Sequence, residues 1–397
     1  MTVTAEDRVA TRRDVLASFG ASSGAAEELL RYNENQFQST DLDLTEFPLP
    51  DESFVEAWRE YAAETDLAGS ILPVSKYLVQ LQFPVEEGMS ERSEYIDATR
   101  RGIETGSMQS ATGLRLRAPE RCRIVIHPTV AGRMPLLIAE EREDFVALLR
   151  ALTRKNEPSA IPASMGASMV SGYNNWHRIA ILRSRFLSQA RPGTWDEEFL
   201  RIKSQKELYQ DRFIILSKGS YSAVNPSDFG LDHEEWLNLS SIIRREHECT
   251  HYFTRRVFSS MRNNLLDELI ADYVGITAAA GRFHASWLLA FLGLENFPKY
   301  RPGGRLENYR GNPPLSDAAF SLLQKVVNAA AASLEDFDRS HIPEFEHAAL
   351  RPALLKMLTR LTVEEMASGE VLADLGREFA REVKARRSPP GWQNAGS

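Results

Sequence analysis

The sequence predicts an α+β protein, and two patterns along the chain indicate this class. Residues 1–120 and 230–385 consist mainly of segments with helical character, whereas residues 121–229 also contain short runs typical of strands. The chain of 397 residues is long enough to bury a large core and to form more than one lobe. We therefore expect a helical N-terminal region (1–120), a small mixed α/β lobe (121–229), a helical lobe (230–385) and a flexible tail (386–397).

Three strands and one helix are predicted in the mixed lobe. Residues 121–127 and 134–138 have strand composition and are joined by a short segment with proline and glycine, and residues 212–217 form a third apolar run. Residues 141–155 have the composition of a helix. The segment 164–176 combines glycines, asparagines and a tryptophan. We interpret it as a tight turn, and the lining of a pocket is the alternative.

Composition and charge exclude several classes of protein. Hydrophobic residues make up 43% of the chain and charged residues 26%, which is the ordinary balance of a globular protein. The formal net charge is −8 and no long basic stripe is present, so nucleic acid is not an expected partner. No apolar run approaches the length needed to cross a bilayer, so no membrane partner is expected either.

The cysteine content favours a cytoplasmic location. The chain has only two cysteines, Cys122 and Cys249, so a disulfide framework is not expected. Arg12 and Arg13 resemble part of a twin-arginine export signal. The segment that follows them is short and rich in serine and glycine, so we interpret it as ordinary helix and turn.

A metal-binding motif, H-E-x-x-H, lies within a helix predicted over residues 232–261. Asp232 can cap this helix, and acidic residues follow in its first turn. His247 and His251 are four residues apart, so they project from one face of the helix and both imidazoles can reach one metal ion. Glu248 lies beside the first histidine, where a carboxylate can accept a proton from a metal-bound water.

A second predicted helix supplies carboxylates at a matching spacing. It begins near Asn263, which we expect to cap it, and ends at Gly281. Glu268 and Asp272 are four residues apart and share a face. A catalytic zinc site needs three protein ligands, and Glu268 is placed to be the third. Asp272 can accept the N–H of a ligand histidine, whereas Asp267 projects about 100° away from Glu268 and should miss the metal.

This arrangement resembles the gluzincin branch of the zinc metallopeptidases, in which H-E-x-x-H on one helix is followed by E-x-x-x-D on the next. The resemblance covers residues 232–281. It implies a zincin-like C-terminal lobe with one zinc ion, in which His247, His251 and Glu268 are the ligands, Glu248 is the general base and Asp272 orients a ligand. Only 16 residues separate His251 from Glu268, slightly fewer than in the best-known gluzincins. The same stretch is also similar to an uncharacterised, metallopeptidase-like bacterial family.

These residues predict a zinc-dependent hydrolase that cleaves a peptide or another small amide substrate. Metal hydrolases commonly stabilise the developing oxyanion with an additional side chain. Candidate donors for this role are His284, Tyr309 and Tyr273, and ordinary packing is the alternative for each of them.

The sequence also contains the elements of a different metal site. Two E-x-x-H elements and a further glutamate are typical of ferritin-like proteins that hold two iron ions and act as oxygenases or oxidases. Pro343 argues against this alternative, because it predicts a helix start at that position, and the alternative leaves His247 without a role. The residues that it would use are Glu248, His251, Glu268, Glu344 and His347.

Overall fold

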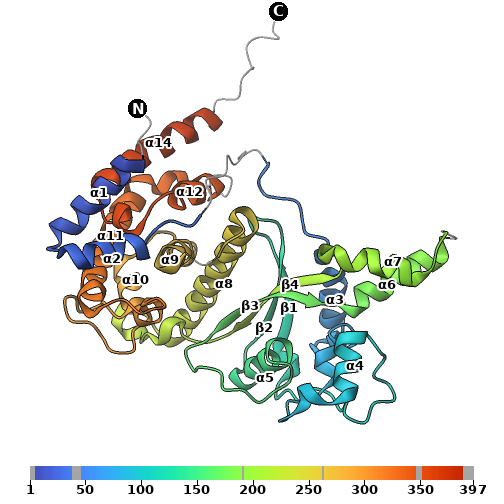
Figure 1. Cartoon of the computed structure of the whole chain (residues 1–397). Helices are drawn as coiled ribbons and strands as arrows, with labels where there is room; N and C mark the ends of the chain where they lie inside the picture. Colours follow the sequence, from blue (N-terminus) through green and yellow to red (C-terminus); the bar gives the residue numbers. More distant parts are fainter. Residues whose placement is uncertain (1–4, 38–45, 190–191, 262, 346–350, 388–397) are drawn as a thin grey trace, which may run out of the picture. The chain divides into compact units, whose positions relative to one another are not determined.

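The computed structural model describes residues 5–37, 46–189, 192–261, 263–345 and 351–387. It is an α+β protein, as predicted, and it divides into two compact units (Figure 1). The first unit combines residues 1–47 with residues 220–397, and the second unit consists of residues 48–219. This division differs from the predicted one, because the N-terminal region contributes residues 1–47 to one unit and residues 48–120 to the other.

A four-stranded mixed sheet forms the centre of the second unit. Its strands are β1 (Cys122–His127), β2 (Met134–Ala139), β3 (Ala167–Asn174) and β4 (Gln210–Ser217), in the order β1-β2-β4-β3. The β2–β4 pair is parallel, and the β1–β2 and β3–β4 pairs are antiparallel. The three predicted strands are confirmed. The interpretation of the segment 164–176 as a tight turn is wrong, since most of it forms β3.

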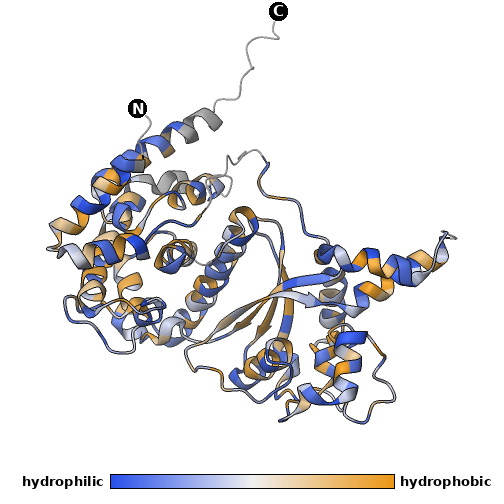
Figure 2. Ribbon diagram, in the orientation of Figure 1, coloured by the Kyte–Doolittle hydropathy of each residue, from blue (hydrophilic) through white to orange (hydrophobic). Residues whose placement is uncertain are grey.

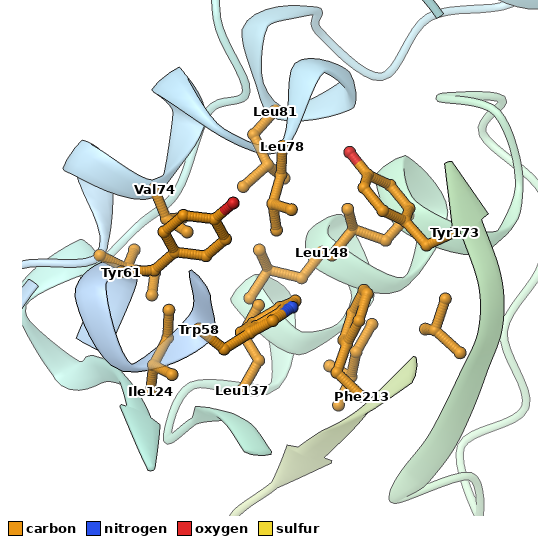
Figure 3. Packing of buried hydrophobic residues seen from close by; sticks show 14 of the residues in the cluster. Trp58, Tyr61, Val74, Leu78, Leu81, Ile124, Leu137, Leu148, Tyr173 and Phe213 are labelled. Atoms are coloured by element: carbon orange, nitrogen blue, oxygen red, sulfur yellow. The ribbon is translucent and has the colours of Figure 1, made fainter. Parts of the chain in front are cut away.

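Helices α3 (Phe54–Ala68) and α5 (Arg142–Thr153) share one hydrophobic core with this sheet (Figure 3). Trp58 and Phe213 meet in it with ring centroids 4.6 Å apart. The remaining helices of the second unit are α4 (Ser93–Arg101), α6 (Trp176–Ser188) and α7 (Trp195–Ser204). Short 3₁₀ segments connect the elements, namely η2 (Leu72–Lys76), η3 (Val79–Gln82), η4 (Met89–Glu91), η5 (Pro119–Arg121) and η6 (Lys206–Leu208).

The first unit contains helices and 3₁₀ segments in the part of it that the structure describes. Figure 2 shows that these helices mix hydrophilic and hydrophobic residues along their length, as expected for helices with one buried face. The helices are α1 (Ala5–Ser18), α2 (Ser23–Tyr32), α8 (His233–Phe258), α9 (Asn264–Ala280), α10 (Ala285–Leu292), α11 (Asp317–Phe345), α12 (Arg351–Leu358), α13 (Val363–Met366) and α14 (Gly369–Arg387). The 3₁₀ segments are η7 (Tyr221–Ala223), η8 (Pro226–Phe229) and η9 (Arg305–Tyr309).

Polar contacts attach the two N-terminal helices to α13. The Arg12 guanidinium, which is buried, contacts the buried Glu364 carboxylate at 3.3 Å. Asn33 Nδ2 also donates to Glu364, at 3.0 Å. These contacts join positions more than 300 residues apart, so residues 1–47 fold with the C-terminal part of the chain.

Helices α8 and α9 start and end close to the predicted positions. Asp232 accepts a hydrogen bond from Glu235 N at 2.8 Å and caps α8, as expected. Gly281 ends α9 with φ of 75°. Asn263 occupies the N-cap position of α9, as predicted, but its side chain makes no capping hydrogen bond. Its Nδ2 donates to Asn35 Oδ1 at 2.9 Å, and its Oδ1 accepts from Gln36 N at 3.2 Å. Pro343 lies in the last turn of α11 and does not start a helix.

Two further features complete the description of the chain. Helix α14 continues to Arg387, so the predicted tail begins within it, and residues 388–397 lie outside the described residues. Among the described residues, no helix combines the length and the apolar character that crossing a membrane requires.

Candidate metal centre

Three predicted ligands meet between α8 and α9. His247 Nε2 and His251 Nε2 lie 3.1 Å apart. The two oxygens of Glu268 face one imidazole each, with Oε2 at 3.5 Å from His247 Nε2 and Oε1 at 3.5 Å from His251 Nε2. Both histidines are buried, and the Glu268 side chain is 19% exposed. The four-residue spacing on α8 and the packing of α9 against it therefore converge two nitrogen donors and one carboxylate.

This donor set suits a zinc ion in both chemistry and dimensions. Two imidazoles and one carboxylate form the ligand set of one class of catalytic zinc sites. Ligand atoms about 2.0–2.1 Å from a tetrahedral zinc lie about 3.3 Å from one another. The separations of 3.1, 3.5 and 3.5 Å in this cluster bracket that value.

A carboxylate holds the other ring nitrogen of each histidine. His247 Nδ1 lies 2.8 Å from Asp272 Oδ1, and His251 Nδ1 lies 2.9 Å from Asp267 Oδ2. Both acids are buried. In the neutral imidazole, a protonated Nδ1 donates to its carboxylate and leaves the lone pair on Nε2, and both Nε2 atoms face the centre of the cluster.

Asp272 thus lies where the sequence predicted an orienting acid, while Asp267 has a role that the sequence analysis missed. Asp267 projects away from Glu268 around the helix, as its position in the sequence predicted. Its carboxylate lies on the far side of the His251 ring from the cluster centre, a position that metal-ligand spacing alone does not indicate.

Tyr221 and Arg305 form a second layer behind Asp272, and the sequence predicted a role for neither. The Tyr221 hydroxyl donates to Asp272 Oδ1 at 2.7 Å and accepts from Arg305 at 2.9 Å. Arg305 also donates to Asp272 Oδ2 and, at 3.1 Å, to Ser222 Oγ. Tyr221 comes from η7 and Arg305 from η9, so two loop segments reinforce the orientation of His247. Neither residue belongs to a recognisable spacing pattern.

The charges of the cluster favour ionised carboxylates. Burial alone would raise the pKa of Glu268, but its hydrogen bond to His251 and the nearby positive charges lower that pKa below its usual range. Burial likewise opposes ionisation of Asp272, and Arg305 and His247 outweigh it and lower the pKa of that acid. Burial also opposes protonation of His251, but Asp267 and Glu268 raise its pKa well above the ordinary value. The carboxylates therefore carry the negative charge that a cation requires.

Glu248, the predicted general base, lies next to His247 on α8. It is half-buried, and it makes no hydrogen bond or ion pair with any residue in the described ranges.

The three candidate oxyanion donors differ in their position relative to the cluster. Tyr309 lies near Glu268, and burial raises the pKa of its hydroxyl, with the Glu268 carboxylate acting in the same direction. His284 instead stacks on Trp287, with ring centroids 5.1 Å apart.

Tyr273, the third candidate donor, turns away from the cluster and donates to the buried Asp338 at 2.8 Å. The structure therefore brings only one of the three candidate oxyanion donors to the site. Glu344 lies in the last turn of α11, and its side chain lies outside the described part of the structure. His347 lies outside the described residues, so the predicted second E-x-x-H element is not part of the described site.

The fold and the site define an α+β protein with a buried His–His–Glu cluster, of a composition that can hold a metal ion. The chain belongs to a family of unknown function, DUF7005, which matches residues 14–370. Comparison with curated proteins and with solved structures finds no match.

Proposed function

We propose that this protein is a zinc-dependent hydrolase that cleaves a peptide bond or another amide bond. The observation that carries the proposal is the convergence of His247 Nε2, His251 Nε2 and Glu268 at separations of 3.1–3.5 Å. When bound, zinc lowers the pKa of a coordinated water toward neutrality and polarises a carbonyl group. His247, His251 and Glu268 would hold the ion and would leave one coordination position for that chemistry.

Residues of this chain would transfer the proton, orient the two imidazoles and stabilise the oxyanion. Glu248 accepts the proton of the attacking water and later delivers it to the leaving amine. Its side chain is suited to this role because it is half-buried and unpaired among the described residues. Asp267 and Asp272 hold the two imidazoles in the tautomer that presents Nε2. Tyr309, through its contact with Glu268, is the nearest candidate to stabilise a developing oxyanion.

A cytoplasmic location belongs to the same proposal. Cys122 and Cys249 are both free and buried, which suits a reducing compartment.

Metal analysis of purified variants tests the ligand assignment. The wild-type protein should contain one zinc ion per chain, and His247→Ala and Glu268→Ala should each lose it. Glu248→Gln should keep the zinc and lose hydrolysis of a quenched-fluorescent peptide panel by at least about 100-fold. His284→Ala is the matched control, since this histidine lies outside the cluster and should keep full zinc content.

Stoichiometric zinc in both ligand variants would refute the ligand assignment. Two iron ions per chain in the wild-type protein would favour the di-metal alternative instead.

A further inference from the structure

The second unit contains a cavity of about 480 Å³ whose lining comes entirely from residues 76–199. Residues of η2 and η3, of α4 and the segment that follows it, and of helices α6 and α7 surround it. Its size falls within the range of small-molecule binding sites, which is about 300–1,000 Å³. No residue of the His–His–Glu cluster contributes to it.

Aromatic rings form much of the cavity wall. Trp195 and Phe199 lie with ring centroids 5.8 Å apart, and Trp176 lies 6.4 Å from Phe199. Trp176 is held in place, because its Nε1 donates to Thr99 O at 2.8 Å. Its ring also lies against Gly102, where an added Cβ would come within 2.2 Å of the indole. These rings offer fixed flat surfaces on which a planar ligand can stack.

The charged groups of the lining are mainly cationic. Lys76, Arg101 and Arg183 line the cavity, against the single acid Glu104. Lys76 and Arg101 each pair with a neighbouring carboxylate, at 3.1 and 2.6 Å. Arg183 makes no ion pair with any residue that the structure describes. The cavity therefore has one guanidinium available for a negatively charged ligand.

His177 adds an oriented polar group to the same wall. Its Nδ1 lies 2.9 Å from the hydroxyl of Tyr61. Asn175 Nδ2 donates to that hydroxyl at 3.1 Å and to the buried Asp211 at 2.6 Å. This chain of hydrogen bonds fixes the imidazole ring, so Nε2 is the ring nitrogen that remains for a ligand.

We propose that this cavity binds a small molecule that combines a planar aromatic ring with a negatively charged carboxylate or phosphate group. The ring stacks on the walls formed by Trp176, Trp195 and Phe199. The anionic group pairs with Arg183, and His177 hydrogen-bonds the ligand between these two contacts. The aromatic walls and the unpaired guanidinium together indicate this ligand class, and neither feature would indicate it alone.

Calorimetric titration with two matched pairs of probes tests this proposal. Adenosine monophosphate is compared with adenosine, and indole-3-acetate is compared with indole. The charged member of at least one pair should bind saturably and more tightly than its neutral partner, and the pair that responds distinguishes phosphate from carboxylate. Arg183→Gln should weaken binding of the charged member about fivefold and leave the neutral member unchanged. Arg185→Gln is the control, because Arg185 is exposed on the same helix and does not line the cavity.

A second variant tests the location without removing a structural contact. Ala180 is exposed and lines the cavity, so Ala180→Phe should fill it and abolish binding of charged and neutral probes alike. Absence of saturable binding by all four probes at millimolar concentration would overturn the proposal, as would equal losses in Arg183→Gln and Arg185→Gln. Binding should persist in Glu248→Gln and after chelator treatment. Ligand binding in the cavity can therefore be supported or refuted independently of the proposed hydrolase activity.

Discussion

Replacing Tyr221 by phenylalanine is the sharpest test of how the cluster is held. The substitution removes one oxygen atom, which donates to Asp272 at 2.7 Å and accepts from Arg305 at 2.9 Å. The ring itself is retained, and with it the edge contact to Phe291 at 4.9 Å between centroids. The hydroxyl also lies 3.0 Å from His247 Nδ1. The expected effect is therefore a looser Asp272 and a less firmly oriented His247, both through Asp272 and through loss of this direct contact.

Two separate considerations give the magnitude of this effect. A hydrogen bond to a charged group contributes about 1.5–3 kcal/mol. Loss of an outer partner of a metal-binding histidine typically weakens metal affinity by about 10–100-fold, which corresponds to about 1.4–2.7 kcal/mol. Asp272 keeps its pairing with Arg305, so its charge is not left isolated. We therefore expect Tyr221→Phe to weaken zinc binding by about 10–100-fold without unfolding the protein.

Zinc affinity is measured by competition with a chromogenic chelator, and stability by urea unfolding of the metal-free protein. Tyr273→Phe is a matched control on α9. Its hydroxyl also donates to a buried aspartate, Asp338 at 2.8 Å, but this pair lies outside the cluster. The control should lose stability in urea to a similar degree and keep the zinc affinity of the wild-type protein.

Two results would refute this reasoning. A zinc affinity within twofold of wild type in Tyr221→Phe would show that the hydroxyl does not orient the site. An equal loss of affinity in Tyr273→Phe would show that the effect is one of general stability.

Three further predictions concern packing, thiol reactivity and pH. Gly275→Ala should destabilise the protein by about 1–3 kcal/mol in urea, because the new Cβ would lie 2.8 Å from the Ile243 carbonyl oxygen; stabilisation would contradict this close helix contact. Burial raises the pKa of Cys122 to about 12, so a disulfide reagent at pH 8 should label it rapidly only after unfolding. Hydrogen bonds from Ser90 lower the pKa of Glu157 below 4.5. The ionised carboxylate therefore stabilises the fold above that pH, and this stabilisation is lost as the pH falls. Glu157→Gln should show a smaller acid-induced loss in the free energy of unfolding, and a loss equal to that of the wild-type protein would contradict this.

The local parts of the site could be predicted from the sequence because they depend on helical spacing alone. A four-residue interval determines that His247 and His251 share a face, and no distant residue alters this. The same holds for the cap at Asp232 and the end of α9 at Gly281. Helix α9 then brings Glu268 to the histidines, which required only a short connection from α8.

Strand β3 could not be predicted, because its stability comes from pairing and not from its own composition. Its sequence mixes serine, glycine and asparagine with apolar residues, which is a weak signal for a strand. It forms nonetheless along β4, with an irregular register between Ser171 and Tyr173 where Gly172 adopts φ of 76°. The glycine that indicated a turn thus accommodates a bulge inside a strand.

The attachment of residues 1–47 to the C-terminal part of the chain could not be predicted from the sequence either. It rests on the packing of α1 against α13 and of α2 against α11, and on polar contacts such as Arg12 with Glu364, between helices that are distant along the chain. Tyr221 and Arg305 escaped prediction for the same reason, because 84 positions separate them and their meeting depends on where two loops pack.

The structure nevertheless reveals a more specific pattern than H-E-x-x-H followed by E-x-x-x-D. Asp267, Glu268 and Asp272 lie at successive helical angles of about 0°, 100° and 140° on α9. Glu268 faces both Nε2 atoms, while Asp267 reaches Nδ1 of His251 and Asp272 reaches Nδ1 of His247. Helix α9 therefore supplies one candidate ligand that faces both histidines, and one orienting acid for each of them. The string D-E-x-x-x-D encodes all three carboxylates, so a chain that retains both histidines but loses either aspartate should present one imidazole without a fixed tautomer.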